Sequence, residues 1–82
     1  MDILTYEEIE KEIEIINLWF RYLLKQNKFD IEASGELLDR LFSLVKHFKE
    51  QNKFKRVFKR MSVKRKLDNL AIEIFKTPVQ LL

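Results

Sequence analysis

Residues 5–26 read TYEEIEKEIEIINLWFRYLLKQ and carry the clearest helical pattern of the sequence. Apolar residues recur in this stretch at the three- and four-residue spacing of a helix. This apolar stripe consists of Ile9, Ile13, Ile16, Phe20 and Leu23. Thr5 and Glu8 have the spacing of a capping box, which satisfies two unpaired N–H groups at a helix start. The stretch therefore predicts an amphipathic helix over residues 6–26 and favours the all-α fold class.

The same helix carries a second apolar face. It consists of Ile15, Leu18, Trp19 and Tyr22. At about 100° per residue, these residues lie at least about 80° from the centre of the first stripe. A surface helix of a globular protein normally has one apolar face, so this helix is either the central helix of the domain or the contact of a homodimer. The four residues are the candidate dimer contact.

Length and composition indicate one small helical domain spanning residues 1–82. The chain is 46% apolar and contains seven Phe, which is too apolar for a disordered protein. One Gly and one Pro are too few for a fold that is rich in loops or β-turns. A domain of this size is marginally stable unless its core is well filled, and the apolar content allows that.

A second helix is predicted over about residues 31–50. Asp30 has the side chain of an N-cap for this helix, and Asn27 that of a left-handed C-cap for the preceding one. Gly35 lies one turn into the helix, where glycine is unfavourable. It indicates either close packing against a neighbouring helix or a later helix start with Ser34 as the N-cap.

The rest of the chain is predicted to form two more helices, at about 53–61 and 63–76. In one unbroken helix, the apolar residues of 53–61 would point about 130° away from the apolar stripe of 31–50. A second shift of similar size separates Met61 from Val63. The sequence therefore predicts a compact bundle of about four helices, followed by an apolar tail at 77–82. The alternative is a three-helix bundle whose long second helix covers residues 31–61.

A four-residue motif occurs twice in the chain. Gln26-Asn27-Lys28-Phe29 recurs as Gln51-Asn52-Lys53-Phe54, each time just after a predicted helix. Its physical interpretation is a helix stop, with Asn as the C-cap and a Phe that packs back onto the fold. Two copies do not indicate a repeat protein, which needs at least three repeats.

Catalysis and metal binding are not expected. The chain has no Cys, and its one His, His47, lies between a basic and an apolar neighbour. A single His in this setting is a poor general base, and a metal site would need further ligands. A single Gly rules out a Gly-rich phosphate loop. The acids from Glu7 to Glu14 are interpreted as a solvated face, with docking against basic residues as a second role. We therefore expect no enzyme activity, no metal, no cofactor and no small-molecule substrate.

The feature that remains is a basic block between residues 46 and 66. Its ten members are Lys46, Lys49, Lys53, Lys55, Arg56, Lys59, Arg60, Lys64, Arg65 and Lys66. Glu50 is the only acid among them, whereas residues 1–45 carry ten acids and five bases. So dense a cluster of like charges is typical of an interaction surface. The basic block is the candidate site for nucleic-acid phosphates or for an acidic protein.

One stretch of the basic block resembles a known family. Ser62-Val63-Lys64-Arg65-Lys66-Leu67-Asp68-Asn69-Leu70 is similar to the recognition helix of helix-turn-helix and winged-helix DNA-binding proteins. The resemblance implies that residues 62 and 64–66 contact DNA while the apolar residues pack inward. It covers nine residues of 82, no Gly marks a turn before it, and nothing after it has the sequence of a wing.

Two functions are expected from these features. The first is a small regulatory protein, not an enzyme, whose basic block contacts DNA or RNA. The alternative is a protein-interaction module, an inhibitor or adaptor that dimerises through its first helix and docks an acidic protein. The longest apolar stretch, residues 13–24, is too short and too interrupted for a membrane span. We expect a soluble cytoplasmic protein for which a membrane surface is an unlikely partner.

The basic block predicts how charge reversal would affect partner binding. Reversal of Lys53, Arg56 and Arg60 to Glu should abolish partner binding and leave the helical content intact, because all three are expected to face solvent.

Overall fold

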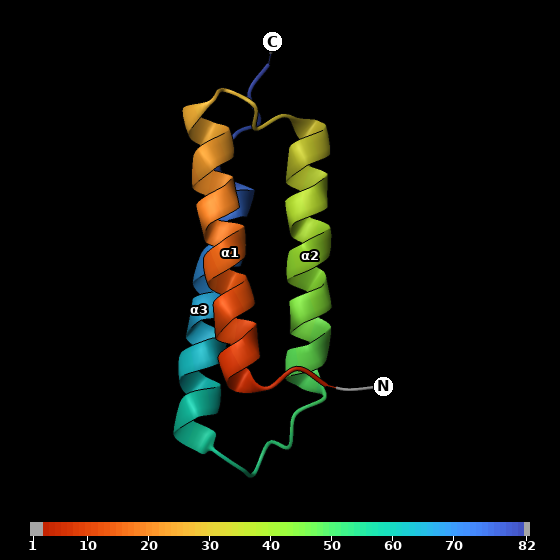
Figure 1. Cartoon of the computed structure of the whole chain (residues 1–82), viewed down its shortest axis with the longest axis vertical. Helices are drawn as coiled ribbons and strands as arrows, with labels where there is room; N and C mark the ends of the chain where they lie inside the picture. Colours follow the sequence, from red (N-terminus) through yellow and green to blue (C-terminus); the bar gives the residue numbers. More distant parts are fainter. Residues whose placement is uncertain (1–2, 82) are drawn as a thin grey trace.

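The computed structural model describes residues 3–81 and consists of three α-helices. They are α1 (Tyr6–Lys25), α2 (Ile31–Lys49) and α3 (Val57–Lys76). The helices run up, down and up side by side, so the α2–α3 loop lies at one end and the α1–α2 loop at the other (Figure 1). The all-α class is confirmed. Across the described chain, none of the helices combines the length and the apolar character that crossing a membrane requires.

α1 begins and ends close to the predicted positions. Thr5 Oγ1 accepts a hydrogen bond from Glu8 N at 3.1 Å, and Glu8 Oε1 accepts one from Thr5 N at 2.9 Å. Both halves of the predicted capping box are therefore present. Asn27, just beyond the helix, has a φ of 56°, the left-handed conformation that commonly ends a helix.

α2 also begins where the sequence predicts. Asp30 is its N-cap, and Asp30 Oδ1 accepts a hydrogen bond from Ala33 N at 2.8 Å. Both explanations for Gly35 are wrong, because the helix already starts at Ile31 and a Cβ atom on Gly35 would meet no other atom within 4 Å. Gly35 lies in open space on the helix surface.

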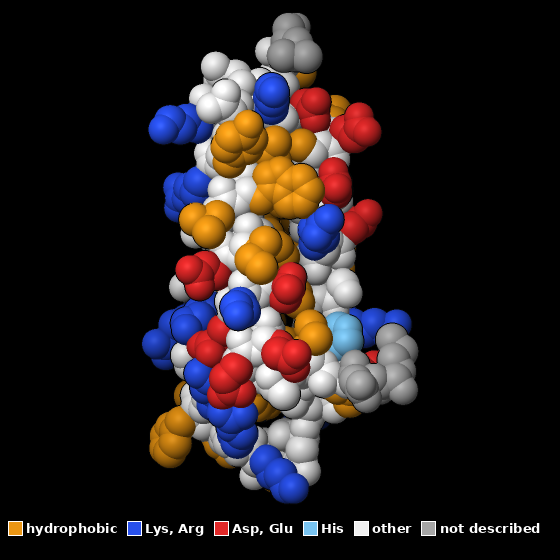
Figure 2. Space-filling model, in the orientation of Figure 1, with side chains coloured by type: hydrophobic (Ala, Val, Ile, Leu, Met, Phe, Trp, Pro, Cys, Tyr) orange, Lys and Arg blue, Asp and Glu red, His pale blue; other side chains and the backbone are white. Residues whose placement is uncertain are grey.

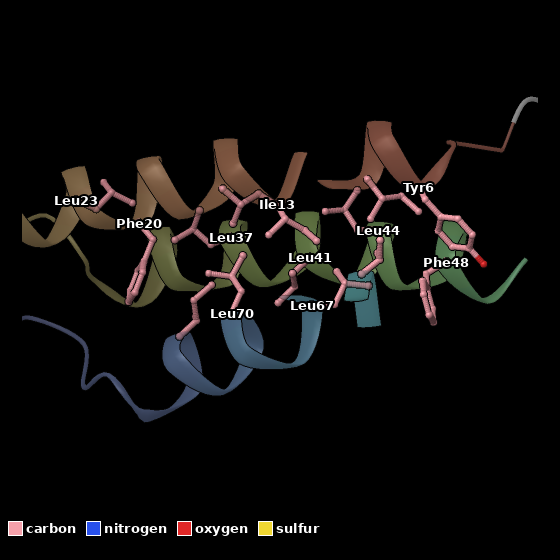
Figure 3. Packing of buried hydrophobic residues seen from close by; sticks show 14 of the residues in the cluster. Tyr6, Ile13, Phe20, Leu23, Leu37, Leu41, Leu44, Phe48, Leu67 and Leu70 are labelled. Atoms are coloured by element: carbon pink, nitrogen blue, oxygen red, sulfur yellow. The ribbon is translucent and has the colours of Figure 1, made fainter. Parts of the chain in front are cut away.

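The three helices enclose one apolar core. Its buried members are Tyr6, Ile9, Ile13, Ile16, Phe20, Leu23, Phe29, Leu37, Leu41, Leu44, Phe48, Val63, Leu67, Leu70 and Ile74. Figure 3 shows side chains from all three helices pointing into the shared space, with Tyr6 and Phe48 together at one end of the core. At the other end, the rings of Phe20 and Phe29 meet edge to face, with centroids 5.1 Å apart. These residues include all five members of the apolar face predicted to be buried on α1, from Ile9 to Leu23.

The prediction of four helices is wrong in the second half of the chain. Residues 53–56 belong to a loop over residues 50–56, and α3 runs unbroken from Val57 through Ser62 to Lys76. The bundle has three helices, as in the alternative, but the long second helix of that alternative is absent because α2 ends at Lys49.

The error has a clear physical cause. The predicted break near Ser62 assumed that the apolar residues between 54 and 61 face the core. They are exposed instead, namely Phe54, Val57, Phe58 and Met61. The buried side of α3 continues from Val63 to Arg60, three residues earlier, so a basic residue takes the core-facing position at this end. No phase shift is needed once the apolar residues point outward.

The segment after α3 packs back onto the α1–α2 loop. Phe29 N donates to Gln80 Oε1 at 2.9 Å, and Gln80 N donates to Phe29 O at 2.7 Å. Val79 is partly buried against the core. Of the predicted tail, residues 77–82, Val79 and Gln80 therefore dock on the domain, whereas Leu81 is exposed and residue 82 lies outside the described residues.

Candidate partner-binding surface

The α2–α3 loop sets the orientation of α3. Asn52 Oδ1 accepts a hydrogen bond from Phe54 N at 2.9 Å, and Asn52 O accepts one from Lys55 N at 3.3 Å. Arg56 then adopts a left-handed conformation, with a φ of 55°, and forms the N-cap of α3 without a side-chain cap bond. From this start, the basic residues of the first turns of α3 meet α1, and the apolar residues face away.

Arg56 is held by the start of α1. Its Nη1 donates to Glu7 Oε1 at 2.9 Å, its Nη2 donates to Glu7 Oε2, and its guanidinium carbon lies 5.6 Å from the centroid of the Tyr6 ring. The bonded guanidinium lowers the pKa of the Glu7 carboxyl from its ordinary 4.5 to about 2. The pair is exposed, so it orients the helices more than it stabilises them.

Glu10 holds two more bases of the block. Lys59 Nζ lies 2.6 Å from Glu10 Oε1, and Lys66 Nζ lies 2.6 Å from Glu10 Oε2. Hydrogen bonds from Lys59 and then Lys66 lower the pKa of the Glu10 carboxyl. Because the two lysines are seven residues apart on one side of α3, a single half-buried acid of α1 fixes two turns of that helix.

Arg60 fills the end of the core. Its guanidinium carbon lies 4.3 Å from the centroid of the Phe48 ring, and its Nη1 donates to Tyr6 Oη at 3.1 Å and to Phe48 O at 3.4 Å. An arginine over an aromatic face is stabilised by about 1 kcal/mol or more when partly desolvated. Arg60 therefore joins all three helices.

The basic block thus divides into two groups. Lys64 pairs with Asp68 one turn along α3, at 2.7 Å, so five bases are engaged within the chain. The other five form no ion pair among residues 3–81, and all are exposed. These unpaired bases are Lys46, Lys49, Lys53, Lys55 and Arg65. They remain available to an anionic partner.

The apolar residues at the start of α3 form the outer patch, made of Phe54, Val57, Phe58 and Met61. The Phe54 side chain is 91% exposed and that of Phe58 is 88% exposed, while the other two are about half exposed. Figure 2 shows hydrophobic side chains protruding at the end of the molecule where α3 begins. Val57, Phe58 and Met61 lie on one side of the first turns of α3, and Phe54 lies in the loop just before the helix, so the outer patch combines a helix face with a loop residue.

A groove between α2 and α3 adjoins this end. It has a volume of about 450 Å³. It is lined by Val45, Phe48, Lys49, Lys53, Arg60, Lys64, Leu67 and Asp68. Four bases and one acid thus surround three apolar side chains, so the groove has the same character as the surface beside it: apolar and positively charged.

The predicted dimer contact lies on another side of α1. Ile15, Leu18 and Tyr22 are exposed there, and Trp19 is half-buried. The guanidinium carbon of Arg40 covers the Trp19 ring at 4.9 Å from its centroid. Trp19 is thus engaged within the chain, and the other three side chains are free to contact a partner.

The structure gives His47 a structural contact. Its Nδ1 accepts a hydrogen bond from Leu4 N at 3.2 Å, which ties the N-terminal segment to the end of α2. Within residues 3–81, no group of three or more His, Cys, Asp or Glu side chains is placed to hold a metal ion.

The stretch that resembles a recognition helix lies inside α3. Ser62 is in the second turn of that helix, so it does not cap a helix start and no turn precedes it. Val63, Leu67 and Leu70 pack inward, as the resemblance implies, and residues 64–66 are exposed. No protein-family model, curated protein or solved structure matches the chain. The resemblance therefore gives no support for a helix-turn-helix arrangement.

Sequence reasoning missed the outer patch. The repeated motif gave no signal, because its two copies are identical in sequence, yet Phe29 is fully buried and Phe54 is almost fully exposed. The interpretation that the Phe packs back onto the fold is confirmed for Phe29 and wrong for Phe54. The run of acids on α1 was a usable signal. Glu7 and Glu10 are three residues apart and hold the bases that would otherwise have faced solvent.

Proposed function

We propose that this protein is a non-enzymatic interaction module that docks an acidic protein partner through its α2–α3 end. The outer patch supplies the apolar anchors of the docking surface. The unpaired bases supply the charge that attracts and orients the partner. The partner therefore presents an apolar groove with acidic residues around its rim.

The observation that carries this proposal is the exposure of Phe54 and Phe58. Each of these rings could bury a large apolar area, yet neither contributes to the core. Aromatic side chains in a compact exposed group are typical of the few residues that dominate the free energy of a protein interface. A face that only bound phosphates would not need four apolar side chains at its centre.

Charge defines the chemistry of the partner. Lys53 and Lys55 flank Phe54 in the loop, and Lys46 and Lys49 lie on the last turn of α2. A neutral or basic partner would leave these charges opposed or unpaired, whereas acidic side chains at the rim would pair with them. The prediction of an acidic protein partner, which was the alternative from the sequence, is therefore the better supported of the two.

A second candidate is a single-stranded nucleic acid. The observation that favours it is the combination of five unpaired bases with two exposed rings, because bases stack on aromatic side chains while lysines contact phosphates. Duplex DNA is less well supported, since Arg56, Lys59 and Arg60, three of the bases expected to track its backbone, face α1.

The experiment is capture of partners from a nuclease-treated extract of the source cells on three immobilised forms of the protein. They are the wild type, Phe54→Ala/Phe58→Ala, and Phe42→Ala/Phe75→Ala. The last is a matched control, because Phe42 and Phe75 are also exposed but lie outside the outer patch. We expect an acidic protein to bind the wild type and the control and to lose at least about tenfold in affinity for the patch variant, as for a residue that dominates an interface.

Two results would count against the proposal. Equal binding to all three forms would remove the outer patch from the interface. Absence of any captured protein from the nuclease-treated extract, together with direct binding of a labelled DNA or RNA strand by the wild type, would favour the nucleic-acid candidate.

A further inference from the structure

One side of α1 stays exposed although the helix packs against both α2 and α3. It carries alternating spacings of three and four residues, the pattern of a helix that packs along another helix. Its members are Glu8, Lys11, Ile15, Leu18, Tyr22 and Lys25, and all six are exposed. Figure 2 shows hydrophobic side chains gathered over the upper part of α1. We call these six residues the α1 stripe.

The charges of the α1 stripe match those of a second copy in one orientation. If two α1 helices lie antiparallel with Ile15 of one opposite Leu18 of the other, then Lys11 lies opposite Tyr22. In the same register, Glu8 lies opposite Lys25. The three layers are an apolar pair, a cation on an aromatic ring and an ion pair, each of which is favourable.

The parallel orientation fails by the same test. It would place Lys11 against Lys11 and Lys25 against Lys25, with Glu8 against Glu8, and like charges at close range oppose association. Glu8 remains available in the antiparallel pair, because its Oε1 accepts the capping bond from Thr5 N and its Oε2 makes no bond within residues 3–81.

From this complementarity we infer that the protein forms an antiparallel homodimer through the α1 stripe, with Ile15 and Leu18 at its centre. The inference extends the dimer contact expected from the sequence by fixing its orientation and register. It does not depend on the proposed function, since the outer patch lies on α3 and its preceding loop.

The antiparallel arrangement has a functional consequence. The α2–α3 loop of each copy lies beyond the N-terminal end of α1 (Figure 1). An antiparallel pair therefore presents its two outer patches at opposite ends of the dimer. Such a dimer would bridge two partner molecules, whereas a parallel one would place both patches on the same partner surface.

Sedimentation equilibrium tests the dimer. We expect the wild type and Ile72→Glu to dimerise, and Leu18→Glu to have a dissociation constant at least about 100-fold higher, because its carboxylate would be buried against Ile15. Ile72 is a matched control, since it is an exposed apolar residue of α3. Circular dichroism checks that both variants keep their helices. A wild-type protein that stays monomeric up to about 1 mM would overturn the inference.

Disulfide cross-linking tests the orientation, because the natural chain has no Cys. Lys11→Cys mixed with Tyr22→Cys should form a cross-linked heterodimer. Lys11→Cys alone should not cross-link. In the antiparallel pair, each copy of residue 11 lies opposite residue 22 of the other copy, so the two copies of residue 11 are about 16 Å apart along the helix axis. Efficient cross-linking of Lys11→Cys with itself would show a parallel dimer and would contradict the inference, whatever the outer patch binds.

Discussion

Arg60 lies over the ring of Phe48, with its guanidinium carbon 4.3 Å from the ring centroid, and it also donates a hydrogen bond to Phe48 O at 3.4 Å. The basic residue thus occupies the position in α3 that an apolar residue would normally take. This contact extends the buried side of α3, which Val63, Leu67, Leu70 and Ile74 form further along, to the first turn of the helix, and Phe58 faces away from it.

The contact makes Arg60 a stabilising residue. Arg60→Ala should lower the free energy of unfolding by about 2 kcal/mol, because it removes a cation–π contact and two hydrogen bonds. Arg65→Ala, on the exposed side of the same helix, should change it by less than about 0.5 kcal/mol. Urea denaturation followed by circular dichroism measures both. Equal effects of the two substitutions would show that the Phe48 contact contributes nothing.

The two copies of the repeated motif should respond oppositely to mutation. Phe29→Ala should destabilise the fold by about 3–5 kcal/mol, because Phe29 is fully buried against Phe20. Phe54→Ala should change stability by less than about 0.5 kcal/mol. Thermal unfolding of the two variants gives the comparison. A strongly destabilised Phe54→Ala protein would mean that Phe54 packs within the fold.

The Glu7–Arg56 pair should make stability depend on acid pH. The pKa of Glu7 falls from its ordinary 4.5 to about 2 in the folded chain, so the unfolded chain takes up the proton first. The stabilising contribution is complete above pH 4.5 and is lost as the pH falls towards 2. Urea denaturation at several pH values should show a shallower loss for Arg56→Gln than for the wild type. The same slope for both proteins would rule out a contribution from this pair.

Gly35 offers a simple way to stabilise the protein. Its position on the surface of α2 leaves room for a Cβ atom and its φ is not positive. Gly35→Ala should raise the free energy of unfolding by about 0.5–1 kcal/mol, since glycine loses more conformational freedom in a helix than alanine does. Chemical denaturation checks this value, and a destabilised variant would point to a neighbour that packs closely on Gly35.

Local signals predicted the first half of the fold well. The cap of Thr5 and Glu8, the cap of Asp30 and the left-handed Asn27 are all decided by residues within a few positions of one another. The regularly spaced apolar residues from Ile9 to Leu23 then predicted which side of α1 is buried. For these elements, the sequence contains the partners of each interaction close by, and each prediction is confirmed.

The start of α3 could not be predicted in this way. An argument from angular phase assumes that apolar residues face the core and basic residues face water. At this end, the residues that Arg56 and Arg60 contact within the chain are Glu7, Tyr6 and Phe48, which lie at least 12 positions away in the sequence. Without those contacts, the basic block is indistinguishable from an exposed surface, and the expected reversal of Arg56 and Arg60 to Glu would have tested stability rather than binding.

NMR mapping would show whether the outer patch docks the partner. Backbone amide shifts of the ¹⁵N-labelled protein would be followed during titration with the acidic protein captured on the wild type. If the outer patch is the interface, the largest changes occur at residues 53–61 and on the last turn of α2, with small changes at the α1–α2 loop. Changes confined to other surfaces, with Phe54 and Phe58 unaffected, would contradict the proposal.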